Sequence, residues 1–256
     1  MKERIITGVV LALVFIGAFA LGHQALFLLM ATLLGIGGYE IYRTQRGKIA
    51  PVMIPVYILA VLIGLFIPET EILAYLSGVM VIYFTLAIFF KWFTFDMVAY
   101  SITLTSLLVA AGVGLRNLLF INKWILVYIL IAAFATDIFA YFGGRRFGKN
   151  KLIPRLSPNK TQEGALIGYA MGVLFSFAYA YFVLAKDLPL ELMISASLLM
   201  PFFSQIGDLS FSLIKRRYGI KDFGVIFPGH GGVLDRVDSV IFAVLVFNIL
   251  ARIMLG

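Results

Sequence analysis

Long apolar runs separated by short polar connections dominate the chain. Nine runs can be distinguished, at residues 5–21, 25–42, 52–67, 72–90, 97–114, 124–142, 164–184, 192–214 and 236–254. Most approach the ~20 residues that a helix needs to cross about 30 Å of hydrocarbon, and the third run is the shortest. This pattern predicts an all-α, polytopic membrane protein with about nine transmembrane helices.

Lysine and arginine residues are unevenly distributed between the alternate connections of these runs. If the N-terminus is cytoplasmic, 17 of them fall on the cytoplasmic side and 4 fall outside. Cytoplasmic loops of membrane proteins carry such an excess of basic residues. We therefore expect a cytoplasmic N-terminus, an external C-terminus, and two long cytoplasmic loops at residues 143–163 and 215–235.

The composition fits one integral membrane domain over residues 1–256. Hydrophobic residues make up 62% of the chain and charged residues only 13%, against about 25% charged residues in ordinary globular domains. We expect scaffold helices in residues 1–115 and catalytic helices and loops in residues 116–256. The absence of cysteine excludes disulfides and cysteine-based metal sites. Basic loops facing anionic lipid explain the net charge of +8, and no nucleic-acid partner is expected.

Four aspartates lie near the predicted cytoplasmic ends of three spans. Asp137 and Asp208 are placed about 10 Å below the membrane surface by the rise of 1.5 Å per residue. Asp235 and Asp238 open the last span and share one helix face. Ionisable groups at membrane depth indicate functional sites, and grouped carboxylates repel one another unless they share a cation or a proton. Oxygen ligands alone favour Mg²⁺ over Zn²⁺. A packing role is the alternative, and it is strongest for Asp137.

The N-terminal half carries little comparable chemistry. Its acidic residues, Glu40, Glu69, Glu71 and Asp96, all fall at span ends. We therefore expect the functional site to be built by residues after Leu115.

The first long loop combines cations with a turn. It carries six Lys or Arg residues between Asp137 and Gly164. The segment from Ser157 to Gly164, SPNKTQEG, has the character of a phosphate-binding turn that leads into a helix N-terminus, where the helix dipole favours anions. This signal is weak by itself, because the segment is neither a Walker A motif nor a dinucleotide fingerprint.

The segment from Ser212 to Asp238, SLIKRRYGIKDFGVIFPGHGGVLDRVD, carries the densest polar chemistry of the chain. A cationic, glycine-rich loop that leads into paired carboxylates suits a metal-bound polyphosphate. His230 fits a turn or a phosphate contact as well as a base, and the three consecutive cations from Lys215 equally fit an anchor on the cytoplasmic side.

This segment resembles the C-terminal pattern of the CDP-diacylglycerol synthases, the phosphatidate cytidylyltransferases. That pattern is S-x-x-K-R, then K-D, then hydrophobic-P-x-H-G-G-hydrophobic-x-D-R-hydrophobic-D. The matching positions are Ser212, Lys215, Arg216, Lys221, Asp222, Phe227, Pro228, His230, Gly231, Gly232, Asp235, Arg236 and Asp238. The turn from Ser157 to Gly164 is similar to a second stretch of the family, whereas the N-terminal half matches only in hydrophobicity.

The resemblance implies a nucleotidyltransferase of phospholipid biosynthesis that transfers the cytidylyl group of CTP to phosphatidate, giving CDP-diacylglycerol and pyrophosphate. It implies a multi-pass protein of the cell membrane with its active site facing the cytoplasm. The implied partners are CTP, phosphatidate and membrane lipid, with Mg²⁺ as cofactor, a second cation left open, and a homodimer suggested. The expected catalytic residues are Asp208, Lys215, Asp235 and Arg236, and the expected metal ligands are Asp208, Asp235 and Asp238. The expected substrate-binding residues are Asp137, Ser157, Lys160, Thr161, Glu163, Ser212, Arg216, Lys221, His230, Gly231 and Gly232.

Two other functions are alternatives to this one. A cation-coupled transporter would also bury carboxylates, but it would place them at the midplane with polar residues toward both faces. Here the polar chemistry lies on one predicted side. A CDP-alcohol phosphatidyltransferase is not indicated, because its D-x-x-D-G-x-x-A-R pattern is absent.

Overall fold

The computed structural model describes residues 2–227 and 231–255, with side chains from Ile6 onward. The predicted substrate-binding residue His230 therefore lies outside the described residues. The elements are α1 (Lys2–Leu21), α2 (His23–Thr44), α3 (Met53–Gly64), η1 (Glu69–Glu71), α4 (Ile72–Phe89), α5 (Phe95–Ile121), α6 (Lys123–Phe147), β1 (Lys151–Ile153), β2 (Ser157–Thr161), α7 (Gln162–Tyr179), η2 (Ala180–Leu184), α8 (Leu190–Arg217) and α9 (Leu234–Leu255).

The prediction of an all-α, polytopic membrane protein is confirmed, apart from one short β-hairpin. The described residues contain nine α-helices, and seven helical segments are long and apolar enough to cross a membrane. The two shorter apolar stretches are Ile6–Leu21 of α1 and Met53–Gly64, which is α3. At 1.5 Å per residue, α3 is only about 18 Å long, which is less than the hydrocarbon thickness.

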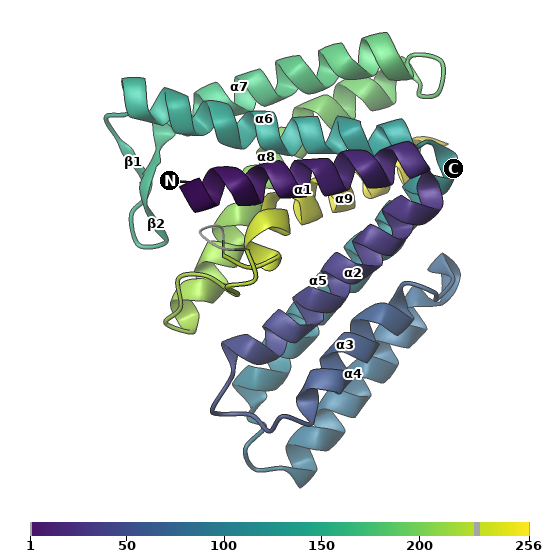
Figure 1. The fold of residues 1–256 in the computed structure, drawn as a ribbon, viewed down its shortest axis with the longest axis vertical. Coiled ribbons are helices and arrows are strands. Elements are labelled where there is room, and N and C mark those ends of the chain that lie inside the picture. Colours follow the sequence, from purple (N-terminus) through teal and green to yellow (C-terminus); the bar gives the residue numbers. More distant parts are fainter. Residues whose placement is uncertain (1, 228–230, 256) are drawn as a thin grey trace. The chain divides into compact units, whose positions relative to one another are not determined.

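The chain forms two compact units. The first unit comprises Met1–Asn117 and Ile220–Arg236. In this unit α2, α3, α4 and α5 run alongside one another (Figure 1). Small residues allow the close approach: a Cβ at Gly38 of α2 would lie 3.1 Å from the backbone of Ile58 in α3. Such contacts are typical of helices that pack in lipid.

A side chain from α5 binds the backbone just after α3. The last carbonyls of α3 accept the N–H groups of the turn that follows, but the carbonyls of that turn need partners of their own, because unpaired backbone groups are costly in an apolar environment. Arg116 donates from Nη1 to the carbonyls of Leu65 at 2.6 Å and Ile67 at 3.1 Å. Arg116 therefore allows the chain to leave the helix and turn toward η1.

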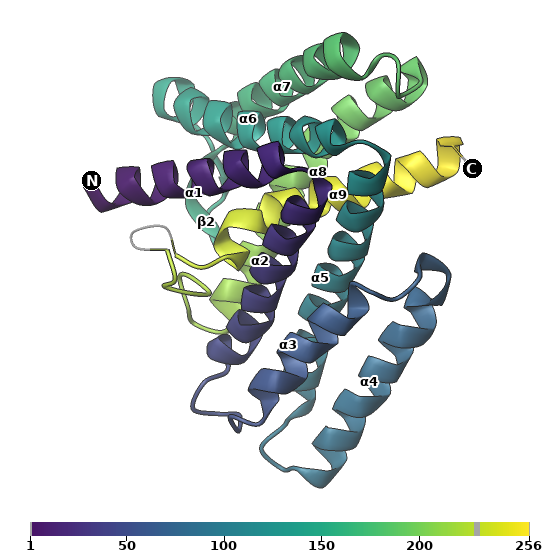
Figure 2. The same cartoon turned by 45° about the vertical axis from the view of Figure 1, so that its right-hand side comes forward.

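The second unit comprises Leu118–Gly219 and Val237–Gly256. In it α6 and α7 lie side by side (Figure 2). Gly164, Gly168 and Gly172 form a buried stripe at four-residue spacing on α7. A Cβ at Gly168 would lie 2.5 Å from the carbonyl oxygen of Thr136, so only glycine permits this contact with α6. This stripe holds the hairpin-bearing end of α6 against the start of α7.

Candidate functional site

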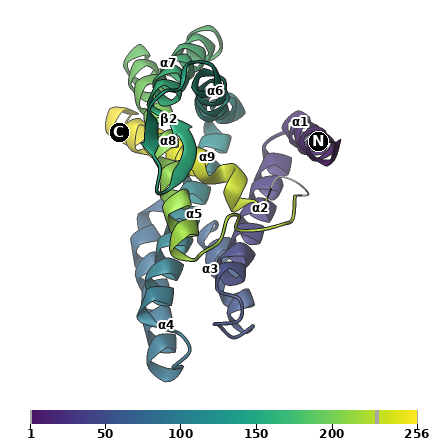
Figure 3. The same cartoon turned by 90° about the vertical axis from the view of Figure 1, so that its left-hand side faces the viewer.

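A two-stranded hairpin connects α6 to α7 (Figure 3), and its second strand, β2, contains Lys160. Strand β1 pairs antiparallel with β2, with Lys151 opposite Thr161. The Thr161 hydroxyl caps α7 by accepting the Gly164 N–H at 3.2 Å. The Glu163 carboxylate accepts the N–H of Lys149 at 3.0 Å and contacts Asn150. Thr161 and Glu163, predicted to bind substrate, thus hold the backbone of this turn.

Lys160 lies near three of the four aspartates predicted at one depth, namely Asp137, Asp208 and Asp238. Its ammonium forms an ion pair with Asp208 of α8. Burial lowers the pKa of the Lys160 ammonium, the neighbouring carboxylates of Asp137 and Asp238 oppose that shift, and Lys215 adds to it. The second unit therefore gathers three carboxylates and two ammonium groups from β2, α6, α8 and α9, an arrangement suited to an ion and a polyphosphate together.

The start of α9 joins this group through Asp238 and Ser239. The Ser239 hydroxyl donates to Asp137 of α6 at 3.0 Å, while Asp238 accepts the Ser239 N–H at 2.8 Å. Asp238 is buried, with 6% of its surface exposed. A Cβ at Gly207 would lie 2.6 Å from the backbone oxygen of Asp238, so α8 and α9 approach closely beside Asp208. Asp137, Asp208 and Asp238 are three of the four aspartates predicted at one depth, and all three belong to the second unit, whereas Asp235 belongs to the first.

The loop before α9 closes on Asp235. The same carboxylate oxygen of Asp235 accepts the N–H of Phe223 at 2.8 Å and of Gly232 at 2.9 Å. Gly231, between them, has a φ of +84°, a conformation that glycine adopts without strain. Asp235 thus shapes the backbone of the motif loop, which comprises residues 220–227 and 231–233. The sequence did not indicate this role.

Glu40 of α2 also contacts this loop. Its sequence position had indicated only that it falls at the end of a predicted span. It is fully buried, and its two carboxylate oxygens accept the N–H of Val233 at 2.9 Å and of Leu234 at 2.8 Å. No motif marks Glu40; the only signal in the sequence is an acidic residue at the end of an apolar run.

The remaining predicted residues are spread over the two units. In the second unit Ser157 lies in β2 opposite Ile153, while Ser212 and Arg216 lie on α8. Arg216 donates from Nε to the carbonyl of Leu156 at 3.3 Å, which ties the end of α8 to the hairpin. In the first unit Lys221 and Arg236 are exposed.

The described residues contain no group of three or more acidic, histidine or cysteine side chains arranged to hold a metal ion. A cage built from protein ligands alone is therefore not formed by the described part of the chain. The assignment of Asp208, Asp235 and Asp238 as metal ligands stays a prediction.

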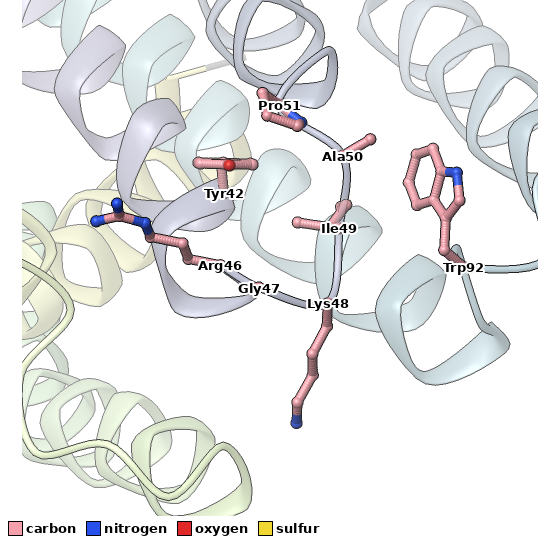
Figure 4. A pocket seen from close by; sticks show the side chains of 8 residues that line it. All are labelled: Tyr42, Arg46, Gly47, Lys48, Ile49, Ala50, Pro51 and Trp92. Carbon is pink, nitrogen blue, oxygen red and sulfur yellow. The ribbon is translucent and has the colours of Figure 1, made fainter.

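A hollow of about 530 Å³ lies in the first unit, and none of the predicted residues lines it. It is lined by Tyr42, Arg46, Gly47, Lys48, Ile49, Ala50, Pro51 and Trp92. Figure 4 shows the side chains of Arg46 and Lys48 extending away from the Trp92 ring. None of its lining residues belongs to the two segments that resemble the family pattern, residues 157–164 and 212–238.

Comparison with known proteins gives the family of the chain. Residues 2–254 match the profile described as the cytidylyltransferase family. The chain is 32% identical over 260 residues to the phosphatidate cytidylyltransferase of Bacillus subtilis, covering 94% of each chain. It is also 32% identical over 267 residues to the protein of the same name from Pseudomonas aeruginosa, covering 96% of this chain and 95% of that one. The chain, with its polytopic helical fold and its grouped carboxylates and lysines, belongs to the cytidylyltransferase family.

Proposed function

We propose that this protein transfers the cytidylyl group of CTP to phosphatidate, giving CDP-diacylglycerol and pyrophosphate. The observation that carries the proposal is the match over almost the whole chain to relatives named phosphatidate cytidylyltransferase. The cluster of Asp137, Lys160, Asp208, Lys215 and Asp238 supports it, because those groups suit a triphosphate and its counter-ion.

The chemistry requires no nucleophile from the protein. A phosphate monoester has a second pKa near 6, so the phosphatidate headgroup is largely a dianion at neutral pH. One of its oxygens attacks the α-phosphorus of CTP, and the bond from that phosphorus to the oxygen bridging to the β-phosphorus breaks. Pyrophosphate leaves with the bonding electrons. The main obstacle is the approach of two anions, which cationic side chains can offset.

The residues present fit Mg²⁺ held jointly with substrate. Mg²⁺ often binds one or two carboxylates and completes its coordination with water and substrate phosphates. Asp208 and Asp238, on helices that approach at Gly207, provide two such carboxylates. When bound, the ion would neutralise phosphate charge. Lys160 forms an ion pair with Asp208, and in this proposal its ammonium would bind the nucleotide phosphates.

The other basic residues of the motif serve to bind phosphate groups in this proposal. Lys215 lies near Asp238 and Lys160, and Arg216 contacts the hairpin at Leu156. We propose Lys215 and Arg236 as catalytic residues that stabilise the transferred and departing phosphates. Ser157, Ser212, Arg216 and Lys221 would contribute to substrate binding, together with the amides around Gly231 and Gly232.

The site is proposed to face the cytoplasm, where CTP is present. The 17-to-4 distribution of basic residues supports this orientation. Bacterial relatives suggest the cell membrane as the location of this multi-pass protein. A homodimer is also part of the proposal; light scattering of the detergent-solubilised protein would test it by giving the mass of two chains or of one.

Pyrophosphate release by the purified, detergent-solubilised protein tests the function. With CTP, phosphatidate and Mg²⁺ present together, we expect steady release. Omission of phosphatidate or chelation of Mg²⁺ should stop it, and release at the same rate without phosphatidate would contradict the proposal.

A further inference from the structure

Glu40 is a buried acid in a membrane-spanning helix. It lies near the end of α2, none of its surface is exposed, and its carboxylate accepts two backbone N–H groups at 2.8–2.9 Å. A buried carboxylate is unfavourable unless hydrogen bonds compensate it. Acidic residues at membrane depth are also uncommon outside functional sites. Its two contacts therefore need an explanation beyond packing.

The two N–H donors show that Glu40 holds the start of α9. Leu234 is the first residue of α9 and Val233 precedes it, so their N–H groups belong to the start of the helix. The first amides of a helix have no partners inside the helix, and a carboxylate is favoured there by the helix dipole. Glu40 supplies this cap from a residue 194 positions away from Leu234 in the chain.

The motif loop is shaped around the same carboxylate. A Cβ added to Gly224 or to Gly232 would collide with the Glu40 carboxylate, so both loop segments rest directly against it. Gly232 in turn donates its N–H to Asp235. Two carboxylates thus fix one short piece of backbone, with Asp235 acting from within the motif and Glu40 from α2.

We propose that Glu40 is a positioning residue for the transfer reaction. It sets the conformation of the loop at residues 220–227 and 231–233 and of the first turn of α9, which carries Asp235 and Arg236. This inference rests on the proposed function, because the loop matters for catalysis only if the motif forms the active site. A role confined to folding would instead affect the whole protein.

The first experiment measures the loop without using activity. The chain lacks cysteine, so a single spin label can be attached through Val225→Cys, where the side chain is 68% exposed, or through Leu166→Cys on α7, where it is 69% exposed. Each label is introduced into the otherwise natural chain, into Glu40→Gln and into Glu40→Asp. Glu71→Gln is the matched control, since Glu71 is an exposed acid in the same unit.

The Gln side chain keeps one acceptor oxygen, and the Asp side chain is one methylene shorter. We therefore expect greater mobility of the label at position 225 in both Glu40 variants. We expect no change at position 166 in either variant, and none at either position in the control. An unchanged signal at position 225 in both Glu40 variants would overturn the proposal. Increased mobility at both positions in both variants would also overturn it, because Glu40 would then support the entire fold.

The second experiment measures the reaction itself. For Glu40→Gln we expect kcat for pyrophosphate release to fall about 10- to 100-fold, the order of loss that small displacements of reacting groups produce. Glu71→Gln should keep the natural rate. A mobile loop with unchanged kcat would contradict positioning while leaving the proposed function intact. An inactive natural protein would contradict the proposed function, while the labels would still report on the loop.

Discussion

At the scale of single residues, the ion pair between Lys160 and Asp208 defines the candidate site best. It joins the hairpin to α8, and the carboxylates of Asp137 and Asp238 act on the same ammonium group by raising its pKa against the effect of burial. Asp208 is a clearer test of the chemistry than Asp235. The Asp235 carboxylate also holds the N–H groups of Phe223 and Gly232, so its substitution would disturb the loop as well.

Asp208→Asn is expected to lower kcat by about 100-fold or more, the order of loss seen when a preorganised charged group at a reacting centre is removed. The variant should remain folded, because the side chain keeps its size. Glu191→Gln, at the other end of α8, should retain activity. Pyrophosphate release over a Mg²⁺ titration provides the measurement, and near-normal turnover of Asp208→Asn would exclude it as a metal ligand.

Lys160→Met should raise the KM for CTP more than the KM for phosphatidate if Lys160 binds the nucleotide phosphates. Lys151→Met is the control, since Lys151 is an exposed cation on the neighbouring strand. Initial rates at varied CTP concentration measure the effect. Equal KM values for CTP in both variants would remove Lys160 from the nucleotide site.

At the scale of elements, the apolar runs predicted the helices, whereas contacts between distant segments were harder to predict. Counting residues along the spans predicted similar depths for Asp137, Asp208, Asp235 and Asp238; the first two and Asp238 belong to the second unit, and Asp235 belongs to the first. Glu40 could not be found in this way, because its partner Val233 is 193 residues distant and neither position has a local pattern that reveals the other. The stripe of Gly164, Gly168 and Gly172 is different, because small residues at four-residue spacing are a local sequence pattern that favours close helix packing.

Gly168→Ala should destabilise the contact between α6 and α7. The added Cβ would meet the carbonyl oxygen of Thr136 at 2.5 Å, and overpacking of this kind costs about 1–3 kcal/mol. Gly78→Ala on α4 is the control, because nothing lies within 4 Å of its Cβ position. Thermal denaturation in detergent should give a lower Tm for Gly168→Ala only. Equal Tm values for the two variants would show that the close helix contact contributes little.

At the scale of the whole molecule, nine predicted spans correspond to seven helical segments of sufficient length among the described residues. The difference arises at α1 and α3, whose apolar stretches are short. Both short helices precede both polar loops in the chain. Omitting the two together therefore leaves the loops on the same predicted side, whereas omitting only one would move both loops to the other side.

Cysteine accessibility tests this orientation. Asn159→Cys in β2 and Val225→Cys in the motif loop should react only with a reagent applied from the cytoplasmic side. Gln24→Cys and Lys186→Cys, also at exposed positions, should react only from outside. Reaction of Val225→Cys from outside would reverse the proposed orientation.

The central claim is that the cytidylyl group passes from CTP to phosphatidate. The most direct measurement follows two radioactive labels, one in the α-phosphate and one in the γ-phosphate of CTP, through an incubation with phosphatidate and the purified protein. We predict that the α-label enters the organic phase as CDP-diacylglycerol, in equal amount to the γ-label recovered in water as pyrophosphate. Transfer of the γ-label to lipid, or absence of the α-label from lipid while CTP is consumed, would contradict the account.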